Sequence, residues 1–248
     1  NLSINNPGSG YTLVFTCTGL PNLVVGPFDV VAATTPYSLA VVTQPQNTYV
    51  GGTFGCAVRI RDVSGSTLTS STLPVTIALF DEPQGATLAG TMTVNAVNGV
   101  ATFAGLSCNK KGTALRLVAA CGNLKTALSS TFNVEGAPVA LAVTNQPRNS
   151  LALNNAGPIS FRIIDADGDP VTRFNTSVTL SLSGGTGGAL LGSSPTSPAS
   201  TTNGSVSFTN VNVDLVGAGC VITAAATGLT SAATEPFDIV AAAGTPAR

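Results

Sequence analysis

The sequence contains no histidine and no tryptophan, and only 8% of its 248 residues are charged. Without histidine the chain lacks the usual general base and the commonest metal ligand, so a serine or cysteine nucleophile would have no partner. Aromatic residues make up 5% of the chain and acidic residues are few and dispersed, which disfavours the paired carboxylates and aromatic cleft of a glycosidase. We therefore expect a protein that is not an enzyme.

Strong charge of either sign is also missing. Ten basic and 11 acidic residues give a net charge of −1, so nothing in the composition would attract a phosphate backbone, and we expect no nucleic-acid partner. No apolar run reaches the roughly 18 residues that a membrane span needs. Residues 1–10 lack the basic start and apolar run of a signal peptide, which indicates a mature form or a piece of a longer protein.

The residues that are abundant favour strands and turns. Hydrophobic residues make up 44% of the chain, which is enough for packed cores and excludes disorder caused by low hydrophobicity. They are mostly alanine and valine, mixed with threonine, serine, asparagine and glycine. Strands favour β-branched residues and turns favour glycine, asparagine and proline. The composition therefore predicts an all-β protein.

Internal repeats define the organisation of the chain. Three motifs of one copy return about 100 residues later: residues 39–45 (LAVVTQP) as 141–147 (LAVTNQP), 75–79 (VTIAL) as 178–182 (VTLSL), and 98–103 (NGVATF) as 203–208 (NGSVSF). Three similar segments mark repeat ends: residues 28–31 (FDVV), 132–134 (FNV) and 237–240 (FDIV). A period of this length fits a small domain with its own core rather than a solenoid unit.

The repeats predict the domain boundaries. Two complete copies cover residues 36–136 and 139–240, and residues 1–33 match only the last third of a copy. We interpret residues 241–248 as a linker or tail. The short connections between copies leave little slack.

Within each copy, apolar residues alternate as expected for half-buried strands. Cys56, Val58 and Ile60 face one way in the first copy, and Ile159, Phe161 and Ile163 take the same inward places in the second. About seven such strands per hundred residues are typical of a two-sheet sandwich. The predicted fold class is all-β, with tandem immunoglobulin-like (Ig-like) β-sandwiches: two full repeats and a partial N-terminal one.

These motifs resemble the bacterial Ig-like repeats of large surface proteins, the relatives of invasin and intimin. The resemblance is carried by residues 39–45, 58–65 (VRIRDVSG) and 90–107 (GTMTVNAVNGVATFAGLS) of the first copy and by their counterparts in the second. It covers essentially the whole chain. It implies an extracellular location, with the repeats acting as spacers or, in a minority of cases, as ligand-binding modules.

The partial copy would contain only the last two strands of a sandwich. Tyr11, Leu13, Phe15 and Cys17 would line its inner face. A lone two-stranded ribbon is marginally stable in water, so something must cover this face. The cover is either upstream sequence that is absent here or a neighbouring subunit that adds strands and builds a fibre.

The five cysteines are consistent with a secreted protein. In an Ig-like fold, Cys56 at the start of the second strand and Cys108 near the crossover of the fifth and sixth strands would form a disulfide. Pairing of Cys121 with Cys56 would need a longer reach across the core. Cys17 and Cys220 have no partner in their own copies, and are either buried thiols or links to other sequence or chains.

Asp165, Asp167 and Asp169 alternate along a turn that contains Gly168. This spacing is similar to the first half of a calcium loop, although the distal glutamate of an EF-hand is missing. An ordinary Asp/Gly turn between strands is the simpler interpretation. If calcium binds, these three carboxylates are its ligands.

The leading functional hypothesis is a spacer or fibre-forming segment of a surface stalk or adhesin, with neighbouring Ig-like repeats or identical subunits as partners. A second hypothesis is a module that binds a glycan or receptor through the loop at residues 183–202. A third is an Ig-like tail or decoration protein of a virus.

Overall fold

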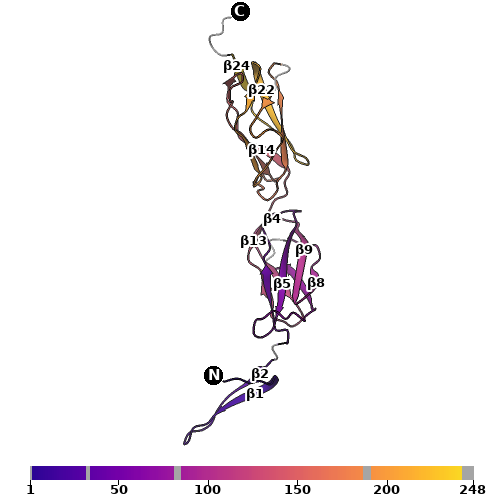
Figure 1. Ribbon diagram of the computed structural model, residues 1–248, viewed down its shortest axis with the longest axis vertical. Coiled ribbons are helices and arrows are strands. Elements are labelled where there is room, and N and C mark those ends of the chain that lie inside the picture. Colours follow the sequence, from indigo (N-terminus) through magenta and orange to yellow (C-terminus); the bar gives the residue numbers. More distant parts are fainter. Residues whose placement is uncertain (1, 32–33, 81–84, 187–190, 242–248) are drawn as a thin grey trace, which may run out of the picture. The chain divides into compact units, whose positions relative to one another are not determined.

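The computed structural model describes residues 2–31, 34–80, 85–186 and 191–241 (Figure 1). Every regular element in these residues is a strand, as the composition predicts, and none of their segments forms a helix capable of crossing a bilayer. Residues 242–248 of the predicted linker or tail lie outside the described residues. The chain divides into two compact units: residues 1–46, 53–107 and 114–132 form the first, and residues 47–52, 108–113 and 133–248 form the second.

The chain begins with a hairpin of two antiparallel strands, β1 (Gly8–Phe15) and β2 (Leu23–Val30). The strands of the first complete copy follow: β3 (Ser38–Thr43), β4 (Thr48–Tyr49), β5 (Phe54–Arg61), β6 (Pro74–Leu79), β7 (Leu88–Ala89), β8 (Thr93–Asn95), β9 (Val100–Cys108), β10 (Gly112–Leu115), β11 (Leu117–Ala120), β12 (Ala127–Leu128) and β13 (Phe132–Glu135). They pair in the orders β3-β5-β9-β7, β12-β11-β6-β8 and β10-β13-β4.

The second complete copy repeats this construction. Its strands are β14 (Ala140–Asn145), β15 (Ser150–Leu151), β16 (Ile159–Ile164), β17 (Ser177–Ser183), β18 (Leu191–Gly192), β19 (Ala199–Ser200), β20 (Ser205–Phe208), β21 (Asn212–Val213), β22 (Gly217–Ala225), β23 (Ala232–Ala233) and β24 (Phe237–Val240). They pair in the orders β14-β16-β20, β15-β24-β22-β17-β19 and β18-β21, with β23 beside β22.

Each complete copy is a β-sandwich whose inward-facing side chains form the core. In β5 and β16 the residues predicted to point inward are buried: Cys56, Val58, Ile60, Ile159, Phe161 and Ile163. Strand β17 alternates in the same way, with Val178 and Leu180 buried between exposed neighbours. The period-two pattern of the sequence therefore becomes an apolar inner face and a polar outer face.

A repeated side-chain lock ties the start of each copy to its last strand. Gln44 and Asn47, from a Gln-Pro-x-Asn segment, accept hydrogen bonds from the backbone N–H groups of Ser130 and Asn133, both at 2.8 Å. The next strand residues then pair in parallel, β4 with β13. Each side-chain amide oxygen thus accepts a hydrogen bond from a backbone N–H group that takes no part in the strand pairing.

The second copy forms the same lock. Gln146 accepts from the Glu235 N–H at 3.0 Å and Asn149 from the Asp238 N–H at 2.8 Å, and β15 pairs in parallel with β24. The Gln-Pro-x-Asn motif is therefore a structural element of the repeat, and residues 1–33 do not contain it.

Candidate functional site

The N-terminal hairpin has the strand register of the last two strands of a complete repeat. Tyr11 pairs with Phe28 as Cys220 pairs with Phe237, and every hairpin residue lies 209 positions before its counterpart. Four pairs of β1 and β2 reappear in this way in β22, β23 and β24. The hairpin is therefore the equivalent of the final strand pair of a sandwich.

Irregular features of the pair are repeated as well. The register shifts between Gly8 and Tyr11, as it does between Gly217 and Cys220. Beside this bulge the Gly10 N–H donates to Asp29 Oδ1 at 2.9 Å. In the last repeat the Gly219 N–H donates to Asp238 Oδ1 at 2.8 Å, across the same separation of 19 residues.

Burial is where the two strand pairs differ. The β1 and β2 strands pair only with each other within the described part of the chain. Phe15 is 51% exposed, whereas its counterpart Ala224 is 0% exposed. Tyr11 and Leu13 are half-buried, although their counterparts Cys220 and Ile222 lie in the core of the last repeat. The apolar residues Leu23 and Val25, which pair with Phe15 and Leu13, are exposed too.

We define the hairpin face as Tyr11, Leu13, Phe15, Leu23, Val25 and Phe28, which share one side because cross-strand partners do so. Three of the four residues predicted to line this face belong to it. Cys17 does not lie in β1, which ends at Phe15. It is exposed in the connection to β2, where its carbonyl accepts from the Leu20 N–H at 3.1 Å.

The predicted Cys56–Cys108 disulfide is absent, and all five cysteines are free. Both residues lie in one sheet, where Cys56 of β5 faces Phe103 of β9. Cys108 is five residues farther along β9, a span of about 16 Å, whereas a disulfide requires Cα atoms within about 7 Å. The error arose from placing Cys108 in a crossover between strands rather than within a strand.

The buried thiols are also expected to be unreactive. Burial raises the pKa of Cys56 to about 11 and raises the pKa values of Cys108, Cys121 and Cys220 as well. Since the thiolate is the reactive form, these cysteines act as small apolar core residues at neutral pH.

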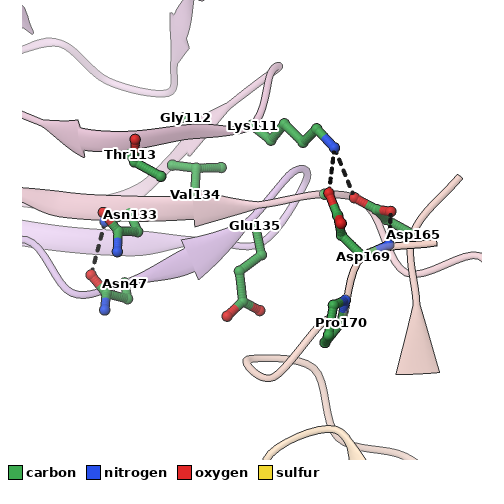
Figure 2. A pocket seen from close by; sticks show the side chains of 11 residues that line it. Asn47, Lys111, Gly112, Thr113, Asn133, Val134, Glu135, Asp165, Asp169 and Pro170 are labelled. Atoms are coloured by element: carbon green, nitrogen blue, oxygen red, sulfur yellow. Dashed lines mark hydrogen bonds and ion pairs between the residues drawn. The ribbon is translucent and has the colours of Figure 1, made fainter. Parts of the chain in front are cut away.

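A second feature, in the second compact unit, is a cluster of charges around Lys111. Its ammonium group contacts carboxylate oxygens of three aspartates, Asp165 at 3.3 Å, Asp169 at 3.0 Å and Asp167. Figure 2 shows Lys111 extending from its turn toward Asp165 and Asp169. Lys111 stays 43% exposed, while the Asp165 side chain is 4% exposed.

The aspartate turn is fixed by hydrogen bonds of its own. Asp165 Oδ1 accepts the N–H groups of Asp167 at 3.0 Å and Asp169 at 2.8 Å. Burial raises the pKa of Asp165, but these two N–H donors and Lys111 outweigh that effect, and the net pKa lies below its ordinary value. The three carboxylates in turn raise the pKa of Lys111. Asp167 and Asp169 contribute most to this increase. Asp165 and Lys111 are thus both charged at neutral pH.

The cluster provides a partial test of the calcium interpretation. One oxygen of each aspartate lies within 4.8 Å of the others, which is compact enough for a shared cation. The converging oxygens already contact Lys111, and Asp165 uses its other oxygen within the turn. Calcium takes six to eight oxygen ligands, so the three carboxylates supply only part of such a shell. Calcium binding stays a prediction.

A pocket of about 390 Å³ lies next to this cluster, lined by Asn47, Lys111, Glu135, Gly136, Asp165, Asp169 and neighbouring residues (Figure 2). Glu135 Oε2 accepts the N–H groups of Thr172 at 2.6 Å and Arg173 at 2.9 Å, and its Oε1 accepts the Thr172 hydroxyl at 2.5 Å. A Cβ on Gly136 would lie 2.0 Å from Asp165 Oδ2. Glycine is therefore required where the chain passes this carboxylate.

Sequence reasoning missed Lys111, Glu135 and Gly136. One signal was available, since the last copy has Val216, Val240 and Ala241 at the corresponding positions. Comparing the two copies for charges present in one alone would have included the lysine and the glutamate among several candidates, such as Arg116 and Lys125. The partner of each charge could not be identified without the fold.

Comparison with known proteins gives no family. No family model matches the chain, and no curated protein matches it. Among solved structures, it is similar to the Escherichia coli adhesin FdeC, with 18% identity, a TM-score of 0.39, and coverage of 84% of this chain and 63% of that one. Domains 1–6 of the surface layer protein SbsC give 19% identity and a TM-score of 0.46, covering 92% of this chain and 30% of that one.

A glycosyl hydrolase family 2 member from Bacteroides cellulosilyticus is also similar, with 15% identity, a TM-score of 0.34, and coverage of 80% of this chain and 28% of that one. The chain thus spans less than two thirds of each of these proteins. All three TM-scores lie below 0.5 and all three identities below 20%.

Proposed function

We propose that the chain is a segment of an extracellular structural repeat protein that acts as a spacer in a bacterial surface stalk or adhesin. The observation that carries this proposal is that one construction is used twice. Both complete copies have a buried apolar core, a Gln-Pro-x-Asn lock at the same place and a parallel strand pairing near their start and end. Duplication of a closed sandwich adds length to a chain.

The contacts of Lys111 and Glu135 in the second unit support a structural role for both side chains. Lys111 and Glu135 each bind several partners on the turns at residues 165–169 and 172–173. Their oxygen and nitrogen atoms are engaged in holding backbone and side chains in place. We propose that these groups stabilise the fold and perform no chemistry.

The finer part of the proposal concerns assembly. The hairpin face exposes apolar residues whose counterparts are buried in a complete repeat. We propose that strands from another Ig-like unit cover it, so that the chain polymerises by strand complementation. Neighbouring Ig-like units are then its main partners.

The experiment is electron microscopy of natively isolated material, with gels run without reducing agent on the same sample. Regular filaments are the expected result. Single particles of one chain that bind glycans on an array would instead favour a binding module at residues 183–202, and co-purification with virus particles would favour a tail or decoration protein. The gels report whether exposed Cys17 links neighbouring chains.

A further inference from the structure

We infer that the hairpin face is built to complete an Ig-like sandwich that lacks its own last two strands, and that an asparagine of this partner accepts a hydrogen bond from the Asp29 N–H. This inference rests on the proposed function and specifies the partner's chemistry. It follows from the two complete repeats, which show what such a strand pair contacts when covered.

The partner must supply two edges. In the complete repeats, β6 and β17 lie antiparallel to β11 and β22, with Ile77 opposite Ala119 and Leu180 opposite Ala224. The same register places an antiparallel partner strand beside residues 13–15 of β1. On the other edge, β4 and β15 lie parallel to β13 and β24, and the corresponding hairpin positions are residues 30 and 31, at the end of β2.

The second edge carries the recognition contact. Asn47 binds the N–H of Asn133, and Asn149 binds that of Asp238. Asp29 is the hairpin counterpart of both donors, since it forms the same bond to Gly10 that Asp238 forms to Gly219. The partner is therefore expected to carry an asparagine at the last position of a Gln-Pro-x-Asn segment.

The glutamine contact does not carry over. Its donors, Ser130 and Glu235, lie outside the strands, whereas the corresponding Gly26 lies within β2 with a φ of 131°. The hairpin also lacks a hydroxyl that both complete repeats have. The hydroxyls of buried Ser129 and Thr234 accept hydrogen bonds from the N–H groups of Leu117 and Ile222, and the hairpin has Val25 at this position.

The core of the partner must also differ in size. Phe15 replaces the alanines Ala119 and Ala224 of the complete repeats, and these two alanines face Ile77 and Leu180. Because overpacking a core is destabilising and volume-conserving changes are tolerated, the partner residue opposite Phe15 is smaller than isoleucine or leucine. This size rule makes the two complete repeats of the chain poor partners for the hairpin.

Neither complete repeat is free to act as the partner without losing its own last strands. Gln44, Asn47, Gln146 and Asn149 are all bound within their own copies. The occupant is therefore a further repeat that lacks a final strand pair, rather than either complete repeat of a second copy.

The test adds such a partner to the full chain. A copy of residues 36–104 is placed directly before residue 1. Residue 1 then occupies the position of residue 105 in the first complete repeat, and Gly8 that of Gly112, so the spacing of a complete repeat is kept. In this copy the residue equivalent to Ile77 is changed to alanine. Hydrogen exchange measured by NMR should show at least about 100-fold protection of the Asp29 amide relative to the unextended chain.

Three variants make the result decisive. The same extension with isoleucine retained should protect the Asp29 amide less than the alanine version does. Replacing a core isoleucine by alanine normally destabilises a fold, so the expected order is the reverse of the usual one. Replacing the copy's equivalent of Asn47 by alanine should remove most of the protection at Asp29. An extension in which residues 105–135 replace residues 1–31 recreates a complete repeat and must fold, which controls for the design.

The inference is overturned if the complete-repeat control folds and the Asp29 amide of the alanine version exchanges as in the unextended chain. It is also overturned if light scattering shows the unextended chain to be a dimer with a protected Asp29, because the occupant would then be a second copy. The covering strands are in the same chain, so the result holds whatever native material looks like in the microscope.

Discussion

The hairpin β1–β2 and the strand pair β22–β24 share a register, a bulge and a hydrogen bond, yet one is exposed and the other buried. Local sequence therefore sets the pairing of two strands, while burial depends on what packs against them. The middle copy of the pair, β10 to β13, adds a third case, because it alone carries Lys111 and Glu135. Comparing equivalent positions among the three copies separates these effects.

The largest difference is expected at the phenylalanine that all three copies share. Phe237→Ala should lower the free energy of unfolding by about 3–5 kcal/mol, since Phe237 is buried in the core of the last repeat. Phe28→Ala in the hairpin should change it by less than about 1 kcal/mol. Urea unfolding of both variants measures the contrast. Equal losses would mean that the hairpin face is already covered in the isolated chain.

The lock should give the next largest effect. Asn149→Ala leaves the Asp238 N–H without its acceptor, and we expect a loss of about 1–2 kcal/mol. Hydrogen exchange of the Asp238 amide should accelerate by the corresponding factor. Asn123→Ala, in an exposed turn, is the matched control and should stay within about 0.5 kcal/mol. An unchanged exchange rate at Asp238 would show that the lock is not needed.

The charge cluster of the middle copy should have a smaller effect that depends on salt. Lys111→Met removes the cation shared by three aspartates, so the melting temperature should fall at low ionic strength. The difference should largely vanish near 1 M salt, where the screening length is about 3 Å. Lys125→Met, a lysine outside this cluster, is the control. A loss that salt does not alter would indicate lost packing instead of lost charge.

The smallest effect is expected from pH. The pKa of Asp165 is lowered in the folded chain, so its charge stabilises the fold above the unfolded pKa near 4. That contribution is lost as pH falls through the still lower folded value. Asp165→Asn retains an oxygen for the turn and should lose less melting temperature than the native chain between pH 7 and pH 3.

A matched variant sharpens this measurement. The pKa of Asp62 is also lowered, first by the hydroxyl of Ser64 and then by N–H groups of its turn. The described partners of its carboxylate are Ser64 and Ser66, whereas Asp165 contacts a lysine. The stability difference between Asp62→Asn and the native chain should therefore depend on pH but not on salt. If both variants depend equally on salt, Lys111 is not the reason for the behaviour of Asp165.

Much of the fold could be predicted from the sequence. The alternation of Ile159, Phe161 and Ile163 identified inward positions because a strand places every second side chain on one face. The repeat period gave the tandem architecture, since equal motifs a hundred residues apart imply equal domains. Neither argument needs to know which strand lies beside which.

The features that the sequence did not predict depend on contacts between distant residues. Cys56 and Cys108 were paired from an assumed topology, but a shift of a few residues along β9 decides whether two thiols can meet. Lys111 lies 54 residues from Asp165, and no local pattern identifies such a partner. The lock was present as a repeated Gln-Pro-x-Asn motif, but its backbone N–H donors lie 86 to 89 residues away.

The parallel pairing of β4 with β13 and of β15 with β24 has a mechanical consequence. When tension is applied to the two ends of a repeat, the early strand is pulled from its N-terminal side and the last strand from its C-terminal side. Because the strands run in the same direction, the load shears all their hydrogen bonds at once, together with those of the amide lock. An antiparallel hairpin such as β1–β2, pulled at its two ends, would instead unzip one bond at a time.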